Sequence, residues 1–223
     1  MVSGKRKPRF LLTLILLAIA VGLVVSSREK RKEQEPVVYE ESLDEIAVEV
    51  NGETLTLRDM AFYVAYEESE VEKKAVVYDS DHPEKYWNMR VKGGFTRVVA
   101  RNAAMQMAIH DALFYQMAEE DGITLTEEEE SRLADTQGDF WADLTDREGE
   151  QLLGVEKKDM DEALRRIAYA QKYQAIYAEL QGKTYEDYDF TAEAYKKLLK
   201  KQDYKINESI WKRVRFGSVT LIH

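Results

Sequence analysis

A stretch of fourteen residues near the start of the polar part of the chain, IAVEVNGETLTLRD, constrains the fold more than any other. Apolar residues alternate over Ile46–Val50, which is the period of a half-buried strand. Asn51 and Gly52 follow at once and supply the positive φ angles of a tight type I′ turn. Thr56 and Asp59 form a pattern that caps the first turn of a helix. The sequence therefore predicts a β-hairpin that runs directly into a helix.

The remaining chain is dominated by helical periodicity, with three prolines and eleven glycines in 223 residues. Helices are expected over residues 57–78, 95–120, 127–144, 157–180 and 191–201. Because an isolated two-stranded hairpin is marginal in water, a third strand is expected to pair with it. Arg213–Leu221 alternates imperfectly and is predicted to be that strand. The expected fold class is mainly α: an N-terminal transmembrane or signal-anchor helix, then a helical domain with a small hairpin or sheet.

An uncharged apolar run, FLLTLILLAIAVGLVV, begins at Phe10 and follows four basic residues. With Ser26 and Ser27 it makes a helix of about 27 Å at roughly 1.5 Å per residue. This is close to the hydrocarbon thickness of about 30 Å, so residues 10–27 are predicted to be a single-pass membrane anchor. A signal peptide that is cleaved after the run remains the alternative. Basic residues flank the run on both sides, but the short basic tail favours an extracytoplasmic C-terminal domain.

Charge and composition divide the chain into five segments. Residues 1–32 carry eight basic residues and one acid, whereas the rest carries 24 basic and 41 acidic residues. Such an acidic exterior argues against nucleic acid as a partner. The expected segments are a basic tail (1–9), the anchor (10–27), a polar linker (28–44), a helical domain (45–182) and a C-terminal helix with a possible strand that completes it (183–223).

No residue pattern indicates an enzyme, a metal site or a cofactor. The three histidines are far apart, and neither a metalloprotease motif nor a phosphate-binding glycine loop occurs. Asp79, Asp81 and His82 precede a proline, which is typical of a helix end and turn rather than of a cation site. The chain has no cysteine, which excludes disulfides and thiolate metal ligands.

Aromatic and methionine side chains are the most suggestive candidates for binding. Most of them are expected in the core, but some can line a groove that accepts apolar peptides. The candidate peptide-binding residues are Tyr63, Trp87, Phe114 and Trp141.

Three segments taken in order resemble the N-terminal chaperone domain of the SurA and PrsA group of extracytoplasmic folding factors. They are VEVNGETLTLRDM (Val48–Met60), AEEDGITLTEEEE (Ala118–Glu130) and LLGVEKKDMDEALRRIAYAQKY (Leu152–Tyr173). The resemblance covers about residues 44–182. It implies a mainly helical domain that holds unfolded or partly folded exported polypeptides.

The chain departs from the family pattern at one point. Many relatives carry a parvulin-type prolyl isomerase domain of about a hundred residues after this region, and the 41 residues here after Gly182 are too few for it. The segment His82–Gly94 has no clear counterpart in the family. We therefore expect a membrane-anchored, extracytoplasmic, chaperone-like protein without isomerase activity, or one secreted after cleavage. A scaffold subunit that binds one folded partner in a cell-envelope complex is the alternative.

Overall fold

The computed structural model describes residues 35–221, and the chain divides into two units after Pro36. The predicted basic tail and anchor, residues 1–9 and 10–27, lie outside the described residues. Among the helices of residues 35–221, none combines the length and the apolar character needed to cross a bilayer. The description below concerns the unit that begins at Val37.

The predicted hairpin is confirmed and becomes part of a three-stranded antiparallel sheet in the order β2-β1-β5. Strand β1 is Ile46–Val50, β2 is Glu53–Thr56 and β5 is Tyr204–Ile206. Asn51 and Gly52 have φ angles of 50° and 88°, as the type I′ turn requires. A second, two-stranded hairpin pairs β3 (Arg90–Val91) with β4 (Gly94–Phe95).

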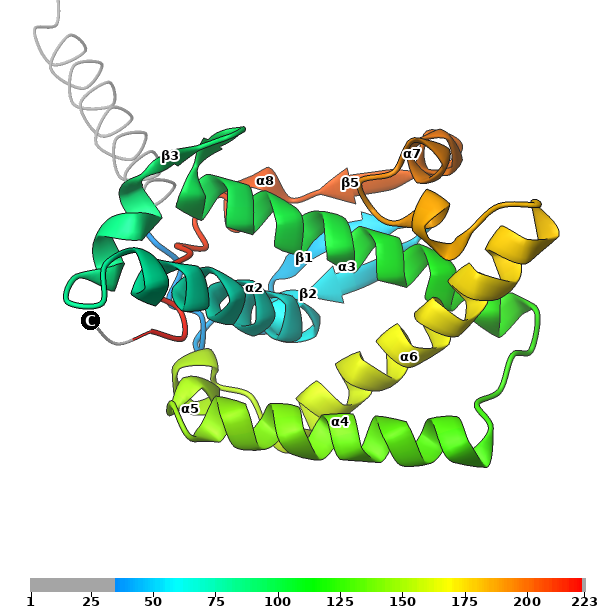
Figure 1. Ribbon diagram of the computed structural model, residues 1–223, viewed down its shortest axis with the longest axis horizontal. Coiled ribbons are helices and arrows are strands. Elements are labelled where there is room, and N and C mark those ends of the chain that lie inside the picture. The colour runs from blue at the N-terminus through cyan, green and yellow to red at the C-terminus, as the bar shows by residue number, and fades with distance from the viewer. Residues whose placement is uncertain (1–34, 222–223) are drawn as a thin grey trace, which may run out of the picture. The chain divides into compact units, whose positions relative to one another are not determined.

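The unit is mainly helical, as expected (Figure 1). Its long helices are α2 (Leu57–Tyr78), α3 (Thr96–Glu120), α4 (Glu127–Thr145) and α6 (Lys157–Leu180). Short helices are η1 (Pro83–Asn88), α5 (Gly149–Leu153), η2 (Tyr185–Tyr188), α7 (Glu193–Leu199) and α8 (Glu208–Trp211). Helix α3 packs against α2, α6 and the sheet, whereas α4 packs on α6 and α5.

Local sequence signals fix where these helices begin. The side chains of Thr56 and Thr126 accept hydrogen bonds from the backbone N–H groups of Asp59 and Glu129. Those acids accept in return from the N–H groups of the two threonines, with donor–acceptor distances of 2.7 Å. Both predicted capping boxes are thus confirmed, and they satisfy N–H groups that a helix start leaves without partners.

The C-terminal stretch shows that the prediction of a strand over Arg213–Leu221 was wrong. The third strand of the sheet is β5, and residues 213–221 form turns instead. The backbone N–H groups of residues 217–220 point to the carboxylate of Glu68 in α2, which is 0% exposed. This carboxylate accepts from the N–H groups of Gly217 and Thr220, both at 2.6 Å, and from the Thr220 hydroxyl at 2.6 Å. A buried acid therefore satisfies the backbone groups that a neighbouring strand was expected to satisfy.

The predicted polar linker, residues 28–44, ends earlier than expected. From Val37 the chain packs on the domain, and Tyr39 and Leu43 are 4% and 8% exposed. The Tyr39 hydroxyl donates to the Leu57 carbonyl at 2.6 Å, and the Val37 N–H donates to the Arg213 carbonyl at 3.0 Å. The apolar side chains within this polar stretch explain the difference, because burying them stabilises the docked chain.

Candidate functional site

The edge of the three-stranded sheet that β5 forms is a candidate binding feature of the described residues. Asn51 donates its N–H to the Asp203 carbonyl, and Asn207 donates to the Ala47 carbonyl. In an antiparallel pair such bonds alternate along the strand. The N–H and C=O groups of Tyr204 and Ile206 therefore face away from β1, and no described residue bonds to them. This edge can accept another strand.

A groove with a volume of about 640 Å³ lies beside this edge. Its floor comes from α3, its walls come from α7 and the segment before it, and α8 closes one end. The apolar lining residues are Val98, Met105, Ile109, Phe190, Tyr195, Leu199, Tyr204, Ile206 and Trp211.

The groove lies where a fourth strand of the sheet would cover α3. Ile206 and Tyr204 pair with Val48 and Val50, whose buried side chains face the helices. The side chains of β5 on that face therefore point over α3 as well, because partners directly opposite in a sheet share a face. The lining is mainly apolar, but Met105 and Ile109 at its base are each 3% exposed, and the exposed side chains of α3 here are Asn102 and Gln106. The groove runs beside the unpaired backbone groups of β5.

The rim of the groove carries charged groups that are already engaged. Lys196 and Lys212 form ion pairs with Glu193 at 2.8 Å and Glu208 at 3.4 Å. The guanidinium of Arg101 donates to the carbonyl of Lys212 at 2.8 Å. Burial lowers the pKa of Arg101. Each charged residue that lines the groove therefore already has a partner within the chain.

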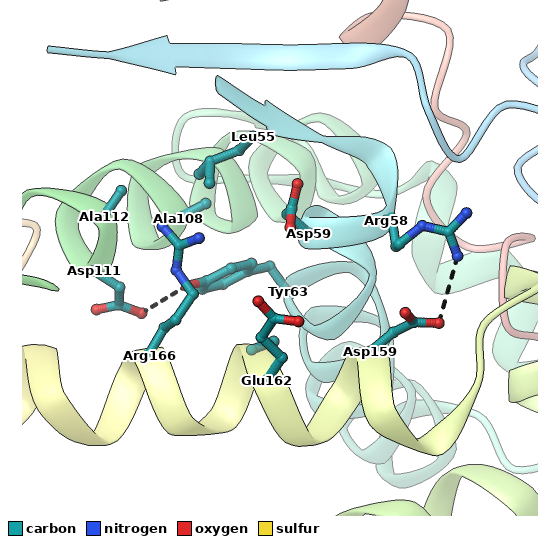
Figure 2. A pocket seen from close by; sticks show the side chains of 11 residues that line it. Leu55, Arg58, Asp59, Tyr63, Ala108, Asp111, Ala112, Asp159, Glu162 and Arg166 are labelled. Carbon is teal, nitrogen blue, oxygen red and sulfur yellow. Dashed lines mark hydrogen bonds and ion pairs between the residues drawn. The ribbon is translucent and has the colours of Figure 1, made fainter. Parts of the chain in front are cut away.

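A second hollow, between α2, α3 and α6, is rich in charge but very small (Figure 2). Its volume is about 40 Å³, enough for about three water molecules at roughly 10–15 Å³ each. Arg58 and Asp159 approach to 3.5 Å across it, and the Tyr63 hydroxyl donates to Asp111 at 3.1 Å. Arg166 forms an ion pair with Glu53 at its edge. These contacts hold the three helices and β2 together, and the hollow has no room for a substrate.

The polar groups of this hollow continue into the core. Asp111 also contacts Nδ1 of His110 at 2.8 Å, and Nε2 of His110 lies 2.9 Å from the Tyr188 carbonyl. Burial, and then the charge of Asp111, raise the pKa of Tyr63 well above its usual value. Tyr63 therefore stays protonated and acts as a hydrogen-bond donor. A structural role explains both Tyr63 and His110. Within residues 35–221 no group of three or more His, Asp or Glu side chains could hold a metal ion.

The four predicted peptide-binding residues do not come together. Trp87 is 1% exposed beneath Gly217. Phe114 is 0% exposed in a hydrophobic cluster that also contains Tyr188 and Tyr195. Tyr63 is 6% exposed at the small hollow, and Trp141 is half-buried on α4. None of them lines the groove. Trp87 and Phe114 belong to the core because large aromatic side chains gain most from burial, so neither offers a surface to a peptide.

Sequence reasoning missed β5 and the groove. A strand of three residues is too short to show a period, and Tyr204–Ile206 carries a lysine between its two apolar residues. The alternation of an aromatic and a β-branched residue between two short helices was the available signal, and it was weak.

Comparisons with known proteins found no match for this chain. No family model matches the sequence, and neither the curated proteins nor the solved structures contain a match.

Proposed function

We propose that this protein is a membrane-tethered, extracytoplasmic chaperone that holds extended segments of unfolded or partly folded exported polypeptides. In this proposal it binds without prolyl isomerase activity, as a SurA- or PrsA-like domain that works by binding alone. The groove beside β5 is its binding site.

The open edge of β5 above an apolar groove is the observation that carries the proposal. An unfolded segment can add to β5 as a fourth strand and bond to the N–H and C=O groups of Tyr204 and Ile206. Alternate side chains of that segment then point into the groove over Met105 and Ile109. Binding through backbone groups tolerates many sequences, which is what a chaperone with varied clients requires.

The size of the site predicts weak and reversible binding. Four backbone hydrogen bonds are worth about 0.5–1.5 kcal/mol each. Association costs roughly 4–15 kcal/mol in lost freedom, which offsets most of this gain and of the apolar burial. A short edge strand therefore favours rapid release, whereas a permanent partner would need a larger interface.

The order of the elements agrees with the family resemblance. A hairpin precedes a capped helix, and the loop at Gly122, with a φ angle of 64°, joins α3 to the capped start of α4. Residues 183–221 supply α7, β5 and α8, which form the groove together with α3. The segment in which many relatives begin an isomerase domain thus builds the proposed binding site here.

Aggregation of a reduced, unfolded client, followed by light scattering, tests the proposal. The fragment 33–223 is expected to suppress aggregation at a few-fold molar excess. Asn102→Trp fills the groove from an exposed position on α3 and is expected to abolish most of this effect. Ser131→Trp, at an exposed position on α4, is the matched control and should act like the unmodified fragment. No suppression by the unmodified fragment, or equal suppression by both variants, would contradict the proposal.

A crosslinking pulldown separates this function from that of a scaffold subunit. Many unfolded clients captured in a groove-dependent manner support the chaperone. One folded partner at fixed stoichiometry, insensitive to Asn102→Trp, would support the scaffold instead.

A further inference from the structure

One end of this acidic domain carries an excess of basic residues, although Asp79 and Glu208 pair with Lys85 and Lys212 there. Residues 85–110 and 209–221 contain eight lysines and arginines and no aspartate or glutamate. The other residues of 33–223 contain 16 basic and 41 acidic residues. Two segments about a hundred residues apart in sequence are therefore depleted of acids in the same way.

The fold brings these two segments together. The Arg101 side chain donates to the Lys212 carbonyl at 2.8 Å, and the Trp211 indole donates to the Arg101 carbonyl at 3.3 Å. Gly217, with a φ angle of 89°, packs directly on the Trp87 ring, where a Cβ would lie 2.5 Å from a ring atom. Figure 1 shows the β3–β4 hairpin and the C-terminal segment at the same end of the unit. The basic residues of both segments thus contribute to one surface.

Four cations at this end have no acidic partner among the described residues. They are Arg90, Lys92, Arg97 and Arg215, and no ion pair of residues 35–221 includes any of them. Burial, and then the charge of Arg215, lower the pKa of Arg97, so these two like charges lie close together. Like charges gathered without counter-charges indicate a surface that meets an anionic partner.

An exposed aromatic side chain lies within the same surface. Phe95, in the β3–β4 hairpin, is 48% exposed, and the Arg90 guanidinium lies 5.4 Å from its ring centre. An aromatic ring beside cations is the arrangement found at the boundary between lipid headgroups and hydrocarbon. Most of the hairpin, although not Phe95 itself, belongs to the segment His82–Gly94, for which the resemblance offers no clear counterpart.

The chain enters the unit at this end. Val37 donates its N–H to the carbonyl of Arg213, between Lys212 and Arg215. The nine residues from 28 to 36 span at most about 30 Å at ~3.3–3.6 Å per residue. If residues 10–27 span the membrane, Val37 and the cations around it therefore lie within reach of the headgroups.

We propose that the basic end, formed by Arg90, Lys92, Phe95, Arg97 and Arg215, rests on the anionic phospholipid surface of the membrane that anchors the chain. This inference rests on the membrane anchoring in the proposed function. Each Lys or Arg near an anionic leaflet strengthens association roughly fivefold, and salt weakens it over a Debye length of about 10 Å. The contact fixes the orientation of the domain relative to the bilayer.

Single labels can test this directly, because the full chain has no cysteine. The full-length protein is reconstituted in vesicles of phosphatidylcholine alone or of an equal mixture with phosphatidylglycerol. A fluorophore is placed at Lys92→Cys or, as the matched control that also loses one lysine, at exposed Lys183→Cys after α6. Quenching by a headgroup nitroxide lipid is expected to be several-fold stronger at position 92. This difference should appear only in the mixed vesicles and should fall at high salt.

Charge reversal supplies the second arm of the experiment. Arg90→Glu with Arg215→Glu is expected to remove the excess quenching at position 92, whereas Lys200→Glu with Lys201→Glu should leave it intact. Equal quenching at positions 92 and 183 would overturn the inference. Excess quenching at position 92 that stays unchanged in the double variant Arg90→Glu with Arg215→Glu would overturn it as well.

The outcomes also separate this inference from the function on which it rests. Protein that fails to float with the vesicles would overturn the anchor, and the inference with it. Protein that floats but shows no difference between the labels would overturn the inference alone. Suppression of client aggregation by the fragment 33–223 should be unaffected by Arg90→Glu with Arg215→Glu, because neither residue lines the groove.

Discussion

The basic end and helix α4 are held in place by different forces. At the basic end a buried carboxylate and a buried indole, Glu68 and Trp87, organise the C-terminal segment. Helix α4 buries two of its side chains, Leu133 and Leu144, whereas α3 buries eleven. It carries seven acids and one base, and it is tied to α6 by ion pairs from Glu129 and Glu130 to Lys172 and Arg165.

This contrast shows that the net charge of a region does not indicate how much its charged side chains contribute to stability. The acids of α4 are solvated or paired at its surface, where each pair contributes little to stability. Glu68 is removed from water, so each of its hydrogen bonds matters more. Burial raises the pKa of Glu68, and the hydrogen bonds from Thr220, Val219 and Gly217 act in the opposite direction. We therefore expect large effects of substitution at the basic end and small ones on α4.

The largest effect is expected for Glu68→Gln. The amide has one acceptor oxygen, and its NH₂ group would face backbone N–H donors, so buried donors of residues 217–220 would lose their partners. The free energy of unfolding should fall by about 3 kcal/mol. Urea denaturation measures this, with Glu67→Gln, one residue away, as the control. A loss below 1 kcal/mol would show that the buried acid does not hold the C-terminal segment.

Gly217→Ala is expected to rank second. Its positive φ angle disfavours a side chain, and the new Cβ would overlap the Trp87 ring. We expect a loss of about 1–3 kcal/mol in unfolding free energy, as in overpacked cores. Gly138→Ala in α4 is the contrasting change, because nothing lies within 4 Å of its Cβ. It should raise stability by up to about 1 kcal/mol, the difference in helix propensity. If the unfolding free energy changed in the same direction in Gly217→Ala and Gly138→Ala, the contrast between the basic end and α4 would be contradicted.

Thr126→Ala is expected to cost about 1 kcal/mol, the usual value for the loss of a helix cap. It removes the hydroxyl that accepts from the Glu129 N–H at 3.3 Å. Thermal unfolding followed by circular dichroism would measure the change, and Thr124→Ala, also exposed and just before the helix, is the control. Equal shifts for both variants would mean that the cap does not determine where α4 begins.

The smallest effect is the acid dependence of α4. The hydrogen bond from Lys172, together with that from the Thr126 N–H, lowers the pKa of Glu129 to about 2. Because the ordinary value is about 4.3, the folded state holds this proton less tightly than the unfolded state. Its contribution to stability is therefore present above about pH 4.3 and is lost as the pH falls toward 2. Carboxyl NMR titration would show this shift, and Lys172→Met should return the pKa of Glu129 toward its ordinary range.

Local features of the sequence predicted local structure well. The Asn51-Gly52 turn and the caps at Thr56 and Thr126 depend on neighbouring residues, and all three are confirmed. The third strand depended on a distant pairing, and the sequence favoured Arg213–Leu221 over Tyr204–Ile206 because the longer stretch contained more alternating apolar residues. The length and alternation of a segment therefore do not show which strand it pairs with.

By itself, the sequence determined the helical character of the domain, the hairpin that opens it and the capped helix starts. These follow from periodicity and from hydrogen bonds between residues a few positions apart. The tertiary structure alone decided which aromatic residues are buried, which strand completes the sheet and where its open edge lies. It also decided that the scattered cations of residues 85–110 and 209–221 meet at one end. Burial and charge clustering arise from contacts between distant segments, and only packing settles which segments meet.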